Sequence, residues 1–181
     1  VTDSDSEIYK INENGSGILS GEADSLMKKA LEMCQRTNGA LDISIYPIVK
    51  AWGFTTGSYQ VPDEETIQTL LTEVDYTQIQ YDGASGNVTI PEGMTIDLGS
   101  IAKGYAGELA ARTLRDKGVT SALLNLGGNV QTIGSKPDGS AWIIGIKDPK
   151  NSDTAMMGLS VTDQAVVTSG GYERYFEQDG H

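Results

Sequence analysis

The sequence predicts an α+β fold, with mostly antiparallel sheet and interspersed helices. Apolar residues recur three and four positions apart in a few segments, which is typical of amphipathic helices. Short alternating segments separated by glycine-containing turns predict hairpins. The strands do not alternate regularly with helices, as a doubly wound parallel sheet requires. With no repeat and no clear linker, we predict one domain over residues 1–181.

The first half of the chain predicts two helices. Residues 1–21 are polar and rich in Gly and Ser, so we expect little regular structure there. Residues 22–37 predict a helix with an apolar stripe and acidic first turn, and Gly39 follows its end. Residues 61–74 predict a second helix with Pro62 in its first turn. Its buried stripe is predicted to be Ile67, Leu70, Leu71 and Val74.

The second half predicts short strands around one long helix. Residues 78–90 predict a hairpin that turns at 82–86. Residues 94–98 predict a strand that leads into a helix from Gly99 to about Lys117. Five further strands are predicted at 122–126, 129–133, 141–146, 159–162 and 165–167, with turns at 127–128 and 137–139.

Charge and residue counts exclude several classes of function. The chain has 13 Lys and Arg against 25 Asp and Glu, a net charge of −12, which repels nucleic-acid backbones and anionic lipid. Cys34 is the only cysteine and His181 the only histidine. The sequence therefore excludes an internal disulfide, a thiolate zinc site and an internal Ser-His-Asp triad. We expect Cys34 to be a small core residue.

The first candidate segment runs from Asp97 to Tyr105, where a strand ends, two small residues turn and a helix begins. N–H groups at a helix start attract anions, and small residues let a phosphate approach. Lys103 is predicted in the first turn, where its charge opposes the helix dipole by about 0.3–1 kcal/mol, which favours a negatively charged ligand. The alternative is that Ser100 is an ordinary N-cap and Lys103 is solvated. The spacing excludes a Walker loop.

The second candidate segment surrounds Asp42, which lies between Leu41 and Ile43 just after a predicted helix. We predict that its carboxylate is buried and hydrogen-bonded, because a buried carboxylate without partners is costly. Such a group is suited to accept a hydrogen bond from an adenine amine or a ribose hydroxyl. The alternative is that Asp42 caps the next helix. Three nearby aromatic residues are predicted as core more than as a flavin-stacking surface: Tyr46, Trp52 and Phe54.

Two glycine-containing segments complete the candidates. Gly127 and Gly128 permit positive φ angles or close approach of a ligand, although a plain tight turn explains them equally well. Residues 168–171 form a polar loop that is suited to meet a phosphate. Glu173 and Arg174 are predicted to form a local ion pair of little energetic weight.

Together and in this order, these segments resemble the ApbE family of FAD:protein FMN transferases. The resemblance covers almost the whole chain and is sharpest at Asp97-Leu98-Gly99-Ser100-Ile101-Ala102-Lys103-Gly104-Tyr105. The other matching segments are residues 4–8 with Asn12, 39–44 with Pro47 and 52–54, 125–129, 134–139 with Trp142 and 148–149, and 168–170.

The resemblance implies transfer of FMN from FAD to a Thr or Ser of a target protein, with release of AMP and with Mg²⁺ as cofactor. A cation on the diphosphate withdraws negative charge and stabilises the leaving phosphate. Two alternatives stay open: a Mg²⁺-dependent FAD pyrophosphatase that yields FMN and AMP, and a non-catalytic flavin-binding module.

By position, the resemblance also implies site residues. The FAD contacts are expected at Ala40, Leu41, Asp42, Gly99, Lys103, Tyr105, Thr168, Ser169 and Gly170. The backbone carbonyl of Ala102 resembles a metal ligand of the family. The family's acidic metal ligands and candidate base come later in its pattern, so we expect them beyond His181 and assign no catalytic residue. We accordingly expect a T-fold-like domain that is incomplete at both termini, is itself inactive and binds Mg²⁺ weakly or not at all.

The resemblance further implies partners and location. The expected acceptor is a flavin-accepting electron-transfer protein, and no nucleic acid is expected. The parent protein is expected to be a bacterial lipoprotein, anchored to a membrane outside the cytoplasm. Strands missing from the sheet would leave an edge open for a homodimer contact.

Overall fold

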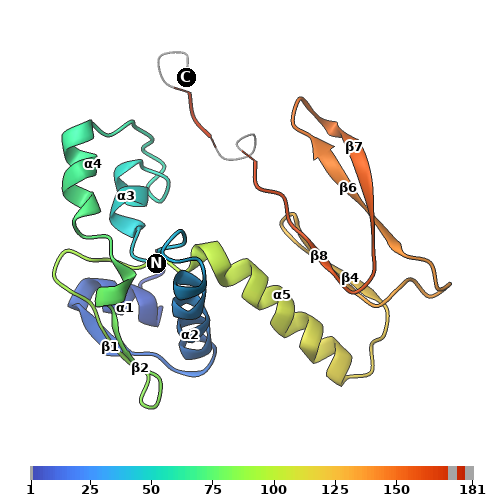
Figure 1. The fold of residues 1–181 in the computed structure, drawn as a ribbon, viewed down its shortest axis with the longest axis horizontal. Helices are drawn as coiled ribbons and strands as arrows, with labels where there is room; N and C mark the ends of the chain where they lie inside the picture. The colour runs from blue at the N-terminus through green and yellow to red at the C-terminus, as the bar shows by residue number, and fades with distance from the viewer. Residues whose placement is uncertain (1, 171–174, 178–181) are drawn as a thin grey trace. The chain divides into compact units, whose positions relative to one another are not determined.

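The computed structural model describes residues 2–170 and 175–177, so the predicted pair of Glu173 and Arg174 lies outside the described residues. The chain divides into two compact units, residues 1–101 with 177–181 and residues 102–176 (Figure 1). Helices and antiparallel sheets make up both, and the α+β prediction is confirmed.

The first unit has helices around a small antiparallel sheet of strand order β1-β3-β2. Its elements are α1 (Glu7–Asn14), β1 (Ser16–Ile18), α2 (Gly21–Arg36), α3 (Tyr46–Ala51), α4 (Glu64–Leu71), the 3₁₀ turn η1 (Tyr76–Gln78), β2 (Gln80–Asp82) and β3 (Asn87–Thr89). The core joins α1, α2, this sheet and the segment that leads to residue 98.

The prediction of little structure in residues 1–21 is wrong. The hydroxyl of Ser6 caps α1 by accepting a hydrogen bond from the N–H of Tyr9 at 3.1 Å. Gly15 ends the helix with a φ of 71°, and Ile11 is fully buried. The segment is mostly polar because α1 is an amphipathic helix that needs only a narrow apolar stripe, so its composition did not indicate a helix.

Helix α2 confirms its prediction to within one residue, and its buried side chains are Met27, Ala30 and Cys34. Cys34 is therefore a core residue, and burial raises the pKa of its thiol. Helix α4 is shorter than predicted, because Asp63 accepts a hydrogen bond from the N–H of Thr66 and leaves Pro62 outside the helix. Its predicted buried stripe is wrong: no residue of α4 is buried, and the six-residue α3 packs beside it.

The hairpin predicted over residues 78–90 is confirmed as β2 and β3. The predicted strand over 94–98 is wrong in kind. That segment is extended, but its one ladder contact is an isolated parallel bridge between Thr95 and Ile45. On the opposite edge of this segment, the side chain of Asn12 forms hydrogen bonds with the backbone of Ile96, where a neighbouring strand would otherwise pair.

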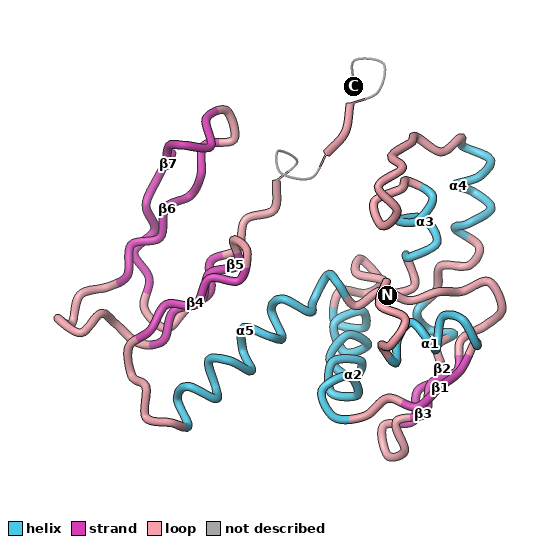
Figure 2. Tube along the Cα trace, turned by 180° about the vertical axis from the view of Figure 1, so that it is seen from behind, coloured by secondary structure: helices cyan, strands magenta, loops and turns pink. Residues whose placement is uncertain are grey.

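The second unit has two separate antiparallel sheets (Figure 2). The first has the order β4-β5-β8, and the second is the hairpin of β6 and β7. The bounds are β4 (Ala122–Leu126), β5 (Asn129–Ile133), β6 (Trp142–Asp148), β7 (Asn151–Val161) and β8 (Ala165–Val166). Strands β4 and β5 match their predictions, whereas β7 is much longer than the predicted 159–162 because pairing with β6 continues through a bulge.

Helix α5 (Gly99–Asp116) has the predicted bounds to within one residue, and the unit boundary falls inside it. Gly107 and Ala111 are buried. A Cβ at Gly107 would lie 2.9 Å from Oε1 of Gln131 in β5, so a glycine lets the helix approach the sheet closely.

Candidate functional site

The carboxylate of Asp42 is the centre of a hydrogen-bonded cluster in the first unit. Its Oδ1 accepts bonds from the N–H of Ser44 at 2.9 Å and the hydroxyl of Ser44 at 2.6 Å. Its Oδ2 accepts a bond from the N–H of Tyr76 at 3.1 Å. Asp42 is half-buried and Ser44 fully buried, so the predicted hydrogen bonds are confirmed, whereas the carboxylate is less buried than predicted.

The alternative that Asp42 caps the next helix is wrong, because α3 begins at Tyr46 with Ile45 as its N-cap. Two carboxylate oxygens offer about four acceptor positions, and three are used here. One remains for a ligand donor. Spacing of Asp and Ser two residues apart is a local signal that predicts the Ser44 contact. Nothing in the sequence predicts the contact with Tyr76, which is 34 residues away.

The neighbours of Asp42 in the expected FAD-contact segment lie in the turn after α2. Ala40 is exposed and Leu41 half-buried. The N–H of Leu41 donates to the hydroxyl of Thr37 at 3.0 Å, and Gly39 reverses the chain with a φ of 80°. Phe54 contradicts the prediction of a core residue: it is 44% exposed and makes an edge-on ring contact with Tyr59.

The start of α5 lies beside the Asp42 segment. The N–H of Asp97 donates to the carbonyl of Ile43 at 2.8 Å, next to the bridge between Thr95 and Ile45. Asp97 Oδ1 accepts a bond at 2.8 Å from the N–H of Gly99, the first residue of α5, and so caps that N–H group. Ser100 is the second residue of the helix, so the alternative that Ser100 is its N-cap is wrong. A Cβ at Gly99 would lie 3.1 Å from that oxygen, so a side chain there would crowd the cap.

In the second unit, Lys103 lies against the turn between β4 and β5. Lys103 is the fifth residue of α5, just past the first turn in which it was predicted, and is exposed. A Cβ at Gly127 would lie 3.6 Å from its Nζ. Gly127 and Gly128 have φ angles of 59° and 87°, which favour glycine. In the part of the chain that the structure describes, Lys103 has no ion-pair partner.

The segment Thr168-Ser169-Gly170 is exposed and follows β8 without regular structure. In β8, Val166 pairs with Val130 and Ala165 with Gln131. The chain therefore leaves β8 at the end of the sheet where the Gly127–Gly128 turn lies. The topology places these three residues at the same sheet end as Lys103, although no hydrogen bond among the described residues joins them.

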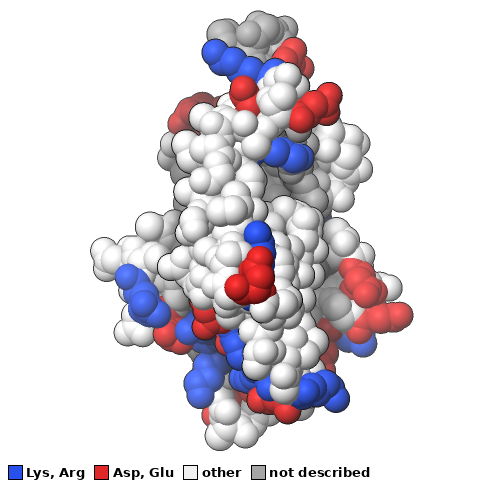
Figure 3. All heavy atoms as spheres, turned by 90° about the vertical axis from the view of Figure 1, so that its right-hand side faces the viewer, with Lys and Arg blue, Asp and Glu red and all other residues white. Residues whose placement is uncertain are grey.

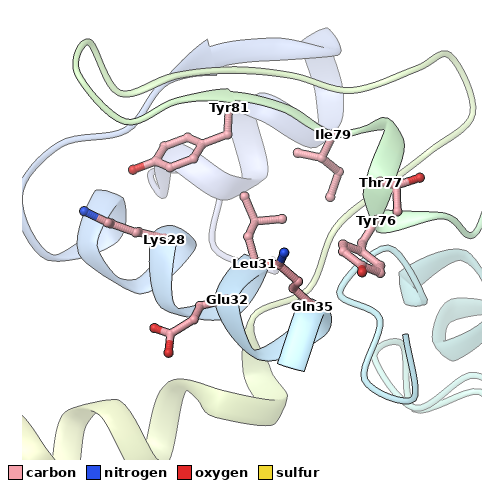
Figure 4. Close-up of a pocket in the computed structure, with 8 residues that line it drawn as sticks. All are labelled: Lys28, Leu31, Glu32, Gln35, Tyr76, Thr77, Ile79 and Tyr81. Atoms are coloured by element: carbon pink, nitrogen blue, oxygen red, sulfur yellow. The ribbon is translucent and has the colours of Figure 1, made fainter. Parts of the chain in front are cut away.

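An open hollow of about 500 Å³ lies elsewhere, on the first unit (Figure 4). Its lining comes from α2 and from the residues around η1 and β2: Lys28, Leu31, Glu32, Gln35, Tyr76, Thr77, Ile79 and Tyr81. None of the expected FAD contacts lines it, so we do not assign it to FAD.

Tyr81 in this hollow predicts a pH effect on stability. Its hydroxyl donates to Oδ1 of Asp24 at 2.7 Å. Burial, and to a smaller extent this hydrogen bond, raises the pKa of Tyr81 to about 12. The folded chain holds the phenol proton more tightly than the unfolded chain, where tyrosine titrates near pH 10. Its contribution to stability is therefore complete below pH 10 and is lost as the pH rises towards 12.

We expect an ultraviolet titration to show one tyrosine that ionises near pH 12, and the denaturation midpoint to fall between pH 10 and 12. In Tyr81→Phe, that late ionisation should disappear. Simultaneous ionisation of every tyrosine near pH 10 would contradict the prediction.

The surface charge is mixed on the face drawn in Figure 3, where Lys and Arg side chains lie among Asp and Glu. Within residues 2–170 and 175–177, no helix is long and apolar enough to cross a membrane.

A family model described as the ApbE family matches residues 1–181. The chain belongs to the ApbE family. A relative from Klebsiella pneumoniae, named FAD:protein FMN transferase, is 41% identical over 145 residues, which are 79% of this chain and 44% of that protein. A relative of the same name from Treponema pallidum is 33% identical over 171 residues, 86% of this chain and 47% of that protein.

Solved ApbE structures share the fold. The ApbE protein of Thermotoga maritima matches with a TM-score of 0.90 and 35% identity, covering 99% of this chain and 59% of that one. The flavinyl transferase ApbE of Pseudomonas stutzeri matches with a TM-score of 0.82 and 28% identity, covering 99% and 57%. The chain thus spans about half the length of the curated relatives that it matches.

The resemblance to the ApbE family also predicted Ala102 as a metal ligand and Tyr105 as an FAD contact. Both residues lie on α5 and are half-buried. The Ala102 carbonyl lies inside the helix, where carbonyls accept hydrogen bonds from the N–H four residues later. Among the described residues, no three His, Cys, Asp or Glu side chains come together as a cation site. The Ala102 carbonyl and the side chains of the described residues therefore do not fit a Mg²⁺ ion, which prefers several hard oxygen ligands.

Proposed function

We propose that this chain is the FAD-binding part of an enzyme that transfers FMN from FAD to a Thr or Ser of a target protein. The observation that carries the proposal is the placement of the Lys103 ammonium group against the Gly127–Gly128 turn in a chain of the ApbE family. A cation beside a glycine turn is suited to a diphosphate, because the turn lets the phosphates come close and the ammonium offsets their charge.

The reaction exchanges one phosphorus–oxygen bond for another. The acceptor hydroxyl oxygen attacks the phosphorus of the FMN half, the bond to the AMP phosphate breaks, and AMP leaves as the hydroxyl loses its proton. In our proposal, Lys103 offsets charge on the diphosphate, and the remaining acceptor position of Asp42 takes an adenine amine or a ribose hydroxyl. Ala40, Leu41, Gly99, Tyr105, Thr168, Ser169 and Gly170 are proposed as further FAD contacts.

Dependence on Mg²⁺ is proposed from the family resemblance. Bound to the diphosphate, the cation would withdraw negative charge from phosphorus. Since the described residues do not fit a magnesium site, we assign no step to it.

The test is incubation of this chain, and of a longer parent chain, with FAD and a candidate acceptor protein, with Mg²⁺ or with a chelator. For the longer chain, transfer predicts AMP release and a fluorescent acceptor band only when Mg²⁺ and the acceptor are both present; this chain is expected to bind FAD without forming either product. Release of FMN and AMP without acceptor would instead indicate a pyrophosphatase. FAD binding by both chains with neither product would indicate a flavin-binding module and overturn the proposal.

We also propose, from the resemblance, that the acceptor is an electron-transfer protein and that the parent protein is a lipoprotein anchored outside the cytoplasm. Recovery of the parent protein in the soluble cytoplasmic fraction of its source cell would contradict that location.

The β6–β7 hairpin supports a homodimer. The cross-strand pairs Ile144–Leu159 and Ile146–Met157 lie on one face, where Ile144 is buried but Leu159 is 39% and Met157 51% exposed. A two-stranded sheet is marginally stable alone, so we propose that the exposed part of this face, at Leu159 and Met157, packs against a second copy. We expect sedimentation to show a concentration-dependent dimer that Met157→Lys abolishes. Ile143→Lys, on the opposite face, should leave it intact; a parent chain that is monomeric at all concentrations would contradict the proposal.

A further inference from the structure

The side chain of Asn12 in α1 pairs with the backbone of Ile96. Its Nδ2 donates to the carbonyl of Ile96 at 2.9 Å, and the N–H of Ile96 donates to its Oδ1 at 2.8 Å. Ile96 is fully buried, Asn12 is half-buried, and 84 residues separate the two. An amide that both donates to and accepts from one residue occupies the place of a neighbouring strand.

The opposite edge of the same segment is held by backbone. Asp97 donates to the carbonyl of Ile43 at 2.8 Å, and Thr95 forms the bridge with Ile45. Successive residues of an extended chain direct their N–H and C=O groups to opposite edges. The segment is therefore fixed on both edges, and the side chain of Asn12 supplies one of them.

This segment connects two of the proposed FAD contacts. Asp97 follows Ile96 directly and caps α5 through the N–H of Gly99, and Ile43 follows Asp42. We propose that Asn12 is a positioning residue for FAD. By holding Ile96, it fixes the position of the backbone that carries Asp97 and Gly99, and with it the register of that backbone beside Asp42. This inference rests on the proposed function, because it takes Gly99 and Asp42 as FAD contacts.

The informative change is Asn12→Asp. Asn12→Ala would leave the N–H and C=O of a fully buried residue without partners, so lost folding would obscure lost binding. The introduced carboxylate still accepts from the N–H of Ile96, but it sets an oxygen against the Ile96 carbonyl. Protonation restores a donor and thus the original pattern of hydrogen bonds. Burial and the facing carbonyl raise the pKa of the introduced carboxyl, so recovery is expected at mildly acidic pH.

The matched control is Asn14→Asp, which adds the same charge to an exposed position of the same helix. It corrects for the general effect of one added negative charge on the binding of an anionic ligand. FAD affinity would be measured by flavin fluorescence from pH 5 to pH 8, for both variants and the unchanged chain, at a temperature where all are folded. Relative to the unchanged chain, Asn12→Asp should bind about tenfold more weakly at pH 8 and within about threefold at pH 5. Asn14→Asp should stay within about twofold throughout.

Two results would overturn the inference: equal affinity of the two variants at pH 8, or a loss in Asn12→Asp that persists at pH 5. A chain that binds no FAD before any substitution would instead overturn the proposed function. In that case, amide exchange tests the positioning itself. Protection of the Asp97 and Gly99 amides, relative to their intrinsic rates, should fall in Asn12→Asp at pH 8 and recover at pH 5; unchanged protection would refute it.

Discussion

Replacing Lys103 with alanine is expected to weaken FAD binding roughly ten- to a hundred-fold and to leave the fold intact. Hydrogen bonds to charged groups contribute about 1.5–3 kcal/mol, and each 1.4 kcal/mol is a factor of ten in affinity. The fold should not suffer, because Lys103 is exposed, lies within α5 and has no ion-pair partner among the described residues. Alanine also favours the helix. The measurements are FAD titration by fluorescence and thermal unfolding.

Lys117→Ala is the matched control for Lys103→Ala. Lys117 is also exposed, but it follows the last residue of α5, at the opposite end of that helix from Lys103. It removes the same charge from a strongly acidic chain, so any general effect of net charge on an anionic ligand appears in both variants. If both lose FAD affinity equally, or neither does, Lys103 has no specific contact with the diphosphate.

The parts of the fold that the sequence predicted are those with local signals. Helices α2 and α5 have apolar stripes within their own residues and a glycine shortly after their ends, and the β4–β5 turn has two glycines. The missed elements depend on partners. Helix α1 is stable because Ile11 enters a core built by distant segments, and β7 extends to Asn151 because β6 pairs with it through a bulge.

The candidate site divides in the same way. The local environment of Asp42 predicted a hydrogen-bonded carboxylate, and Ser44 lies within two residues of it. Tyr76 and Asn12 reach their partners across 34 and 84 residues, and no single sequence shows which backbone group a distant amide will meet. A motif therefore predicts where a contact lies, whereas the groups that hold the motif in place come from the tertiary structure.

Replacing Asp42 with alanine is expected to lower the free energy of unfolding by about 2–4 kcal/mol, besides weakening FAD binding. It leaves the N–H and hydroxyl of fully buried Ser44, and the N–H of Tyr76, without their acceptor. Each buried donor left unpaired costs about 1–3 kcal/mol, and water entering the half-exposed site recovers part of the total. Urea denaturation measures the change.

The chain supplies its own control for Asp42→Ala in Asp138. Its carboxylate accepts bonds from the N–H and hydroxyl of Ser140 at 2.9 and 2.7 Å, the same local pattern as Asp42 with Ser44, but the pair is exposed. Asp138→Ala should therefore change stability much less, because water replaces both bonds. Asp42→Asn should fall between them: its amide oxygen still accepts from Ser44, whereas its NH₂ group faces the N–H of Tyr76. Equal midpoints for Asp42→Ala and Asp138→Ala would show that neither burial nor the contact with Tyr76 adds to the local turn, and that Asp42 is free to serve the ligand alone.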